Sequence, residues 1–212
     1  MLRKATKKET QFFENTLYPL QDKLLALINT NKFYLSGGTC LSRFYYQHRY
    51  SVDLDFFFDG HNHPKSEFNS TFNELTKRFE NSFQVERDKD DEYFKRVIVH
   101  KNDTALKLEF ILEFWEQIGG LKKIKNFYID SKENLATNKI TTVYGRKTEK
   151  DYFDLLFLLK EFPLKDIIRF SETKIVPLDY EGVMMCLHGT SFREDDDVLM
   201  IKAISKQKFI KI

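Results

Sequence analysis

Two aspartates inside an apolar strand constrain this chain more than any other feature. Asp53 and Asp55 alternate with Val52, Leu54 and Phe56 in the stretch SVDLDFFF. Because successive side chains of a β-strand point to opposite faces, the two carboxylates should share one face and lie close together. Like charges so placed raise each other's pKa, and burial adds a desolvation cost. The segment therefore needs a counter-charge that its apolar neighbours do not supply.

A divalent cation would meet this need. Mg²⁺ or Mn²⁺ takes hard oxygen ligands, so two carboxylates with open positions for water and phosphate oxygens suit either ion. Asp53 and Asp55 are therefore the candidate metal ligands. The alternative is a simple alternation of surface residues on an edge strand, and the aspartates alone leave that alternative open.

A glycine turn shortly before the aspartates predicts a phosphate site. A predicted strand ends at Gly37-Gly38, which lead into a helix expected over 39–49 with Thr39 as its N-cap. Glycine lets the backbone approach a ligand closely, and free N–H groups at a helix N-terminus favour phosphate. Ser36 and Thr39 offer hydroxyl donors. A phosphate beside a carboxylate-bound metal is the arrangement that phosphoryl or nucleotidyl transfer requires.

Hydrophobic periodicity predicts the remaining elements. A helical stretch near the N-terminus should be divided in two at Tyr18-Pro19. The order of elements indicates an α+β fold with a mixed β-sheet, and we expect a core over 1–130 and a mostly helical region over 131–212 that completes the active site. The other expected elements are a helix over 66–81, a meander of antiparallel strands over 83–88, 92–101 and 105–114, a loop or short strand over 118–130, a helix after the N-cap Ser131, and a buried helix over 149–162.

Composition and charge exclude several classes of protein. The net charge of +2 over 212 residues does not make the chain a general polyanion binder. Cys40 and Cys186 lack metal-ligand spacing, which indicates a reducing compartment without a disulfide framework. The N-terminus lacks the apolar run of a secretory signal, and no apolar run is long enough to span a bilayer. We therefore expect a cytoplasmic protein with no membrane partner.

The glycine turn and the aspartates together resemble the nucleotidyltransferase AbiEii/AbiGii toxin family, a branch of the DNA polymerase β-like nucleotidyltransferase superfamily. The family's Gly-Gly-Thr-x-Leu turn corresponds to GGTCL at 37–41, and its Arg-x-Ser-x-Asp-[Ile/Leu]-Asp-[Phe/Leu] motif to RYSVDLDF at 49–56. The resemblance implies a nucleotidyltransferase-type mixed sheet flanked by helices. It also implies a nucleotide-binding role for Ser36, Gly37, Gly38, Thr39, Arg49 and Ser51.

The family pattern continues toward the C-terminus. A helical lysine corresponds to Lys139, and a basic residue-Asp-x-x-Asp-Leu pattern corresponds to KDYFDL at 150–155. The resemblance implies that Lys139 contacts the nucleotide phosphates and that Asp154 is part of the active site. Lys150 and Asp151 are expected beside the nucleotide.

Asp154 and Glu109 are the remaining candidate catalytic carboxylates. Asp154 lies in the apolar run YFDLLFLL and should have a cationic partner, although an ion pair that only braces helices is an alternative. Nucleotidyltransferases usually use a third carboxylate on a neighbouring strand, and Glu109 is the candidate. Glu109 shares a predicted strand face with Lys107, which indicates either an active-site face or a solvated one. The candidate partners of Asp154 are Lys139, Arg146 and Lys150.

These observations predict a Mg²⁺- or Mn²⁺-dependent nucleotidyltransferase that transfers a nucleoside monophosphate from a nucleoside triphosphate to an acceptor. The resemblance implies the toxin of a type IV toxin–antitoxin or phage-defence system, a cognate antitoxin protein, and an RNA acceptor such as tRNA. The basic segments LKKIKN (121–126) and GRKTEK (145–150) could contact an RNA backbone. The alternatives are a phosphotransferase acting on protein or a small molecule, and a catalytically silent relative that binds nucleic acid or a protein partner.

Overall fold

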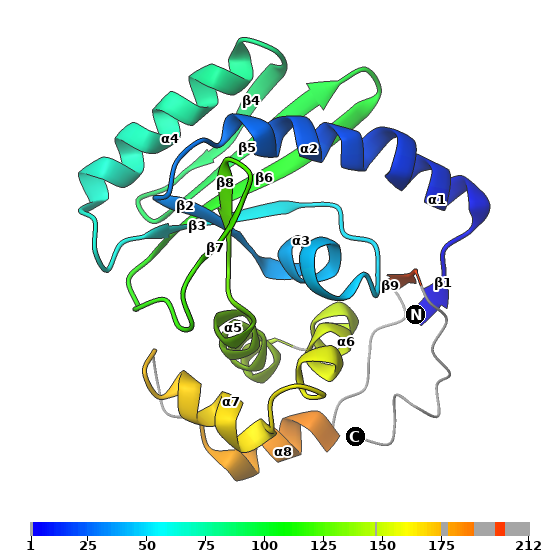
Figure 1. Cartoon of the computed structure of the whole chain (residues 1–212), viewed down its shortest axis with the longest axis vertical. Coiled ribbons are helices and arrows are strands. Elements are labelled where there is room, and N and C mark those ends of the chain that lie inside the picture. Colours follow the sequence, from blue (N-terminus) through cyan, green and yellow to red (C-terminus); the bar gives the residue numbers. More distant parts are fainter. Residues whose placement is uncertain (1, 147, 175–177, 189–197, 202–212) are drawn as a thin grey trace.

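The computed structural model describes residues 2–146, 148–174, 178–188 and 198–201. Within these residues, a seven-stranded mixed β-sheet forms the centre of the fold, in the order β4-β5-β6-β3-β2-β8-β7 (Figure 1). The β6–β3 and β2–β8 pairs are parallel, and the other neighbours are antiparallel. The predicted meander and the α+β class are confirmed. The strands are β2 (Phe33–Ser36), β3 (Leu54–Asp59), β4 (Gln84–Asp90), β5 (Phe94–Lys101), β6 (Thr104–Glu113), β7 (Lys122–Ile124) and β8 (Phe127–Ile129).

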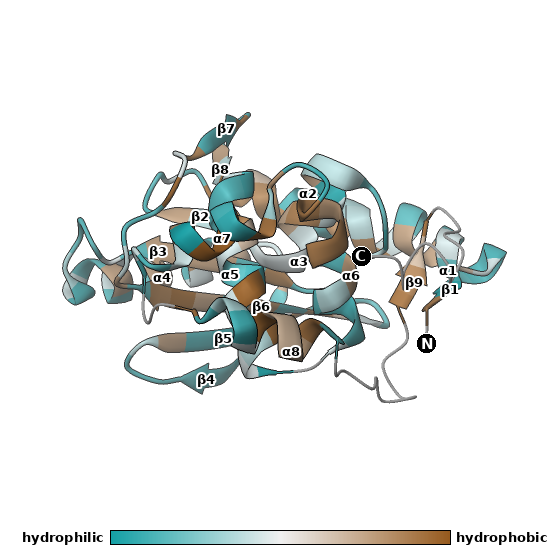
Figure 2. Cartoon of the chain, turned by 90° about the horizontal axis from the view of Figure 1, so that it is seen from below, coloured by the Kyte–Doolittle hydropathy of each residue, from teal (hydrophilic) through white to brown (hydrophobic). Residues whose placement is uncertain are grey.

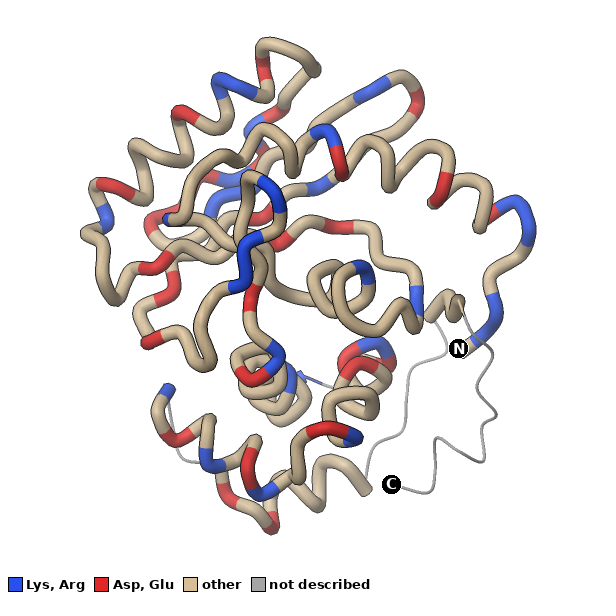
Figure 3. Tube along the Cα trace, in the orientation of Figure 1, with Lys and Arg blue, Asp and Glu red and all other residues tan. Residues whose placement is uncertain are grey.

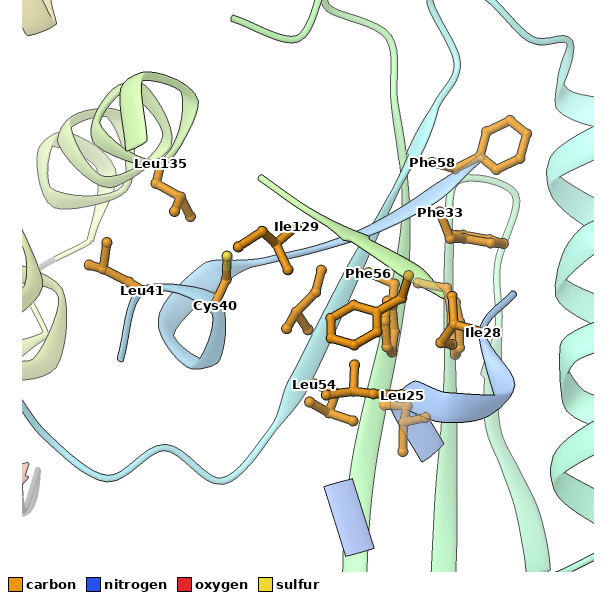
Figure 4. Packing of buried hydrophobic residues seen from close by; sticks show 14 of the residues in the cluster. Leu25, Ile28, Phe33, Cys40, Leu41, Leu54, Phe56, Phe58, Ile129 and Leu135 are labelled. Atoms are coloured by element: carbon orange, nitrogen blue, oxygen red, sulfur yellow. The ribbon is translucent and has the colours of Figure 1, made fainter. Parts of the chain in front are cut away.

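One face of the sheet is apolar and carries the core. Phe56 and Phe58 of β3 are fully buried there, as alternation along the strand requires. Helix α4 (Lys65–Glu80) packs on this face, with the Phe68 ring 5.5 Å from that of Phe58. Burying each such ring contributes about 1.5–3 kcal/mol. Figure 4 shows how the same packing continues through Cys40 and Leu41 to Leu135.

The N-terminal helical run corrects one prediction. Helix α1 (Lys7–Phe12), the π-helical turn η1 (Phe13–Leu17) and α2 (Tyr18–Leu27) follow one another without a break. The predicted division at Tyr18-Pro19 is therefore wrong. Proline lacks an N–H and disrupts a regular α-helix, but here it stands at the start of α2, directly after the π-helical turn. The wider turn lets the helical path continue through the proline.

The segment after the glycine turn also begins differently from the prediction. Helix α3 (Gly37–Cys40) starts at the glycines, and Ser36 occupies the N-cap position. The expected N-cap role of Thr39 is wrong because the Thr39 hydroxyl donates instead to the backbone carbonyl of Asp53. A π-helical segment, η2 (Leu41–Tyr46), follows directly.

Helices α5 to α8 lie on the other side of the sheet from α2 and α4 (Figure 1). The predicted N-cap Ser131 is confirmed, because its hydroxyl accepts a hydrogen bond from the Asn134 N–H. Parts of the region predicted over 131–212, namely 147, 175–177, 189–197 and 202–212, lie outside the described residues. The helices are α5 (Lys132–Gly145), α6 (Glu149–Leu158), α7 (Leu164–Ser171) and α8 (Tyr180–His188).

A short strand near the C-terminus returns to the N-terminus. Strand β9 (Val198–Met200) is apolar (Figure 2) and pairs in parallel with β1 (Leu2–Lys4). Its backbone also binds the segment before β3, because Tyr50 N–H donates to the Leu199 carbonyl over 2.8 Å. The two ends of the described chain therefore meet beside the residues that precede the aspartates.

None of the helices that the structure describes has both the length and the apolar character needed to cross a membrane.

Candidate functional site

A pocket of about 400 Å³ lies over the polar face of the central strands. Phe57 and Ile111 line it from β3 and β6, and Leu135 lines it from α5. Thr39 and Asp154 are the predicted site residues that do not line it. The predicted residues that do are Ser36, Gly37, Gly38, Arg49, Ser51, Asp53, Asp55, Glu109, Lys139, Lys150 and Asp151.

The two glycines allow close approaches on both sides of the turn. Gly37 has a φ of +67°, which a residue with a side chain rarely adopts. A Cβ atom on Gly37 would collide with the Asp55 carboxylate, and one on Gly38 would collide with the Arg49 guanidinium. The glycines therefore let the turn lie directly against an acidic and a basic group of the pocket.

Replacing Gly37 with alanine should lower the free energy of unfolding by about 1–3 kcal/mol and abolish activity. The left-handed backbone accounts for the loss of stability, and displacement of Asp55 accounts for the loss of activity. Chemical denaturation of Gly37→Ala measures the first effect. Gly145→Ala is the matched control for stability, because a Cβ at Gly145 meets no atom within 4 Å. Equal stability of the two variants would contradict the predicted strain.

Asp55 is a carboxylate without a compensating charge. Among the described residues, no side chain forms a hydrogen bond or ion pair with it. Burial, with the nearby carboxylates of Glu109 and Asp53, raises the pKa of Asp55 to about 6. The oxygen donors of Asp53 and Asp55 therefore suit a divalent cation, which would supply the missing positive charge.

Glu109 lies beside Asp55, because β6 pairs with β3 in a register that places the two residues next to each other. Unlike Asp55, Glu109 is compensated. Its Oε1 atom lies 2.8 Å from Arg96 Nη2 and 3.2 Å from Lys107 Nζ. Lys107 Nζ also lies 3.1 Å from Asp53 Oδ2. The predicted strand face of Lys107 and Glu109 is thus the pocket face.

Asp154 does not line the pocket, but it forms ion pairs with two basic residues that do, Arg49 and Lys139. Its carboxylate is fully buried and accepts two hydrogen bonds from Arg49, from Nε over 2.6 Å and from Nη2 over 2.8 Å. Lys139 Nζ lies 2.8 Å from the same carboxylate, and His48 Nε2 lies 2.7 Å from it. Although burial opposes ionisation, Arg49 and Lys139 hold the pKa of Asp154 well below its ordinary value.

Lys139 is shared between two carboxylates of α6. Besides Asp154, it donates to Asp151 Oδ1 over 2.7 Å, and Arg146 Nε donates to Asp151 Oδ2 over 3.1 Å. Of the three partners proposed for Asp154, the structure therefore pairs Lys139 with it and places Arg146 on Asp151. Lys150 lines the pocket and has no ion pair with a described residue.

The Ser36 hydroxyl donates to Asp130 over 2.6 Å, a contact that sequence reasoning missed. Asp130 is fully buried and also accepts hydrogen bonds from Gln117 and Asn134. Burial raises the pKa of Asp130, and these three hydrogen bonds oppose the shift. The contact joins the start of the glycine turn to the start of α5, the helix that carries Lys139.

Several other residues in or near the pocket were not predicted as site residues. Val198 and Leu199 reach the pocket because β9 pairs with β1 and its backbone binds Tyr50. Asn138 lines the pocket next to Lys139 and accepts a hydrogen bond from Lys174 over 3.0 Å. Lys107 could have been found from its strand alternation with Glu109, whereas His48 is distinguished only by its contact with Asp154.

Comparisons with known proteins agree with this geometry. A family model described as "Nucleotidyl transferase AbiEii toxin, Type IV TA system" matches residues 20–175. Uncharacterized protein aq_aa25 of Aquifex aeolicus (strain VF5) is 26% identical over an alignment of 196 residues that covers 88% of this chain and 83% of that protein.

Two solved structures share the fold. MenT4, a nucleotidyltransferase toxin of Mycobacterium tuberculosis H37Rv, has a TM-score of 0.59 at 13% identity, covering 92% of this chain and 79% of MenT4. JHP933 of Helicobacter pylori has a TM-score of 0.57 at 22% identity, covering 74% of this chain and 71% of JHP933. Since the family model spans more than half of the sequence, the chain belongs to the AbiEii nucleotidyltransferase toxin family of type IV toxin–antitoxin systems.

Proposed function

We propose that this protein transfers a nucleoside monophosphate from a nucleoside triphosphate to an acceptor hydroxyl, with Mg²⁺ or Mn²⁺ as cofactor. The observation that carries the proposal is the contact of the Gly37 turn with the uncompensated Asp55 carboxylate. It places a backbone suited to phosphate next to a carboxylate suited to a cation.

Asp53 and Asp55 would hold the cation. Bound there, it would neutralise charge on the triphosphate and balance the two carboxylates. The pocket presents further positive charge from Arg49, Lys139 and Lys150. Because Arg49 and Lys139 are held by Asp154, their positions are set before a nucleotide binds.

The transfer needs a group that receives the acceptor's proton. In the proposed reaction, the acceptor oxygen attacks the α-phosphorus, the bond to the bridging β-phosphate oxygen breaks, and pyrophosphate leaves. Glu109 is the proposed proton acceptor. It forms ion pairs with Arg96 and Lys107, and it lies next to Asp55 in the sheet.

An RNA acceptor such as tRNA is supported by the distribution of basic residues. The lysines of the β7–β8 hairpin gather in one basic stretch (Figure 3). Arg146 and Lys150 line the pocket, and 63% of the Arg146 side chain is exposed. Basic groups at the pocket and on the hairpin would attract a phosphate backbone. We further propose that a cognate antitoxin controls the activity in the cell, as the family implies.

Incubation with each α-³²P-labelled nucleoside triphosphate, Mn²⁺ and total cellular RNA tests this function. We expect label on RNA with the wild-type protein and none with Asp53→Asn, because that variant lacks a proposed metal ligand. Label on the protein instead of RNA would reassign the acceptor. Transfer from γ-labelled but not α-labelled triphosphate would favour the phosphotransferase alternative. No transfer from either label would contradict the proposal and favour a binding role.

A further inference from the structure

We propose that the Lys107 ammonium takes the place of a second metal ion, so that the pocket binds one divalent cation, between Asp53 and Asp55. This inference rests on the proposed function and specifies how the site is charged. It concerns a residue that the sequence motifs do not include.

The position of Lys107 follows from the strands. Lys107 and Glu109 are two residues apart on β6 and therefore share a face. The register of β6 with β3 brings that face beside Asp55. Lys107 Nζ lies 3.1 Å from Asp53 Oδ2 and 3.2 Å from Glu109 Oε1, so the ammonium bridges the two carboxylates.

The three carboxylates are therefore not equivalent. Glu109 has Lys107 and Arg96 as partners, whereas Asp55 has no ion pair with a described residue. Among the residues that the structure describes, no three acidic, histidine or cysteine side chains converge in a way that could hold a metal ion. Glu109 therefore does not complete a three-residue metal site with Asp53 and Asp55, and the ammonium lies between Asp53 and Glu109.

The net charge around Asp53, Asp55 and Glu109 favours the binding of a single divalent cation. Arg96 is shared with Asp88, so the ion-paired group together with Asp55 comprises four carboxylates and two cations and has a net charge of −2 when all four carboxylates are ionised. A single divalent cation neutralises that charge, and a second one would add strong repulsion at short range. Binding of a second ion at Glu109 would also require Lys107 to give up both of its ion pairs.

A titration with Mn²⁺ alone, followed by the electron paramagnetic resonance signal of free Mn²⁺, tests the inference. We expect one bound ion per wild-type chain. Lys107→Gln should bind a second ion or bind the first about tenfold more tightly, because a neighbouring positive charge is gone. Lys107→Arg keeps the charge and should bind like wild type. Lys77→Gln, on the exposed side of α4, controls for the change in net charge.

Two results would overturn the inference while leaving the proposed function intact. One is binding of two ions by the wild type, and the other is identical binding by wild type and Lys107→Gln. In both cases the transfer reaction would still be observed. By contrast, wild-type protein that binds no Mn²⁺ and transfers no nucleotide would remove the proposed metal site and this inference together. The double variant Asp53→Asn/Asp55→Asn should bind no ion and defines the background. Thermal unfolding confirms that each variant is folded.

Discussion

Replacing Asp154 with alanine should lower the free energy of unfolding by about 3–5 kcal/mol and abolish activity. The fully buried carboxylate accepts two hydrogen bonds from Arg49 and lies 2.8 Å from Lys139 Nζ. Arg49 and Lys139 are themselves buried, so the variant would lose a shared counter-ion for two cations. Removal of one partner from a buried ion pair is strongly destabilising because it leaves an uncompensated charge.

Chemical denaturation of Asp154→Ala and wild type measures the difference. Asp103→Ala, at an exposed turn, removes the same group and should change stability by less than about 0.5 kcal/mol. The pKa of Asp154 lies well below its ordinary value in the folded protein. Its stabilisation is therefore complete above the unfolded-state pKa of about 4 and is lost only as the pH falls toward the folded-state pKa. A difference below 1 kcal/mol at neutral pH would contradict the predicted role.

Asp55→Asn should abolish activity and yet stabilise the protein by up to about 3 kcal/mol at pH 7.5. Burial and two neighbouring carboxylates raise the pKa of Asp55 from 3.8 to about 6. The folded protein therefore binds the proton more tightly than the unfolded chain, and ionised Asp55 destabilises the fold. At about 1.4 kcal/mol per pKa unit, the neutral amide should recover most of that cost. Loss of a proposed metal ligand accounts for the loss of activity.

The pH dependence of the free energy of unfolding shows whether ionised Asp55 destabilises the fold. The contribution of Asp55 to wild-type stability should rise as the pH falls from above 6 toward 4, because the proton is bound first by the folded state. Asp55→Asn should lack that rise, whereas Asp103→Asn, at the exposed turn, should retain it. Excess Mn²⁺ should stabilise wild type and not the variant. A variant less stable than wild type at pH 7.5 without metal would contradict the argument.

Local pattern was sufficient to predict the face of the sheet on which Asp55 lies. Alternation along one strand places Leu54 and Phe56 in the core and Asp55 on the opposite face, whatever the rest of the chain does. The glycine turn could also be predicted from the sequence, because only glycine readily adopts the positive φ found at Gly37. The exception was Pro19, where a π-helical turn let the helical path continue past a residue that usually interrupts it.

Contacts between segments that are far apart in the sequence could not be predicted in this way. Asp154 pairs with Lys139, one of its expected partners, but its bidentate partner Arg49, 105 positions away, was not expected. Ser36 was expected to offer its hydroxyl to phosphate, yet it donates to Asp130, 94 positions away. In both cases several partners satisfy the chemistry of the side chain, and the packing of α5 and α6 against the glycine turn decides which of them it contacts.

Strand alternation and the glycine turn thus determined which face of β3 is acidic and where the backbone turns close to it, because both depend on backbone geometry over a few residues. Tertiary structure decided which charges are already compensated. Glu109 is paired by Lys107 and Arg96, and Asp55 is left without a counter-ion, because the β5–β6–β3 register brings those groups together. Charge compensation depends on which side chains lie close together in the folded protein, so local sequence patterns do not reveal it.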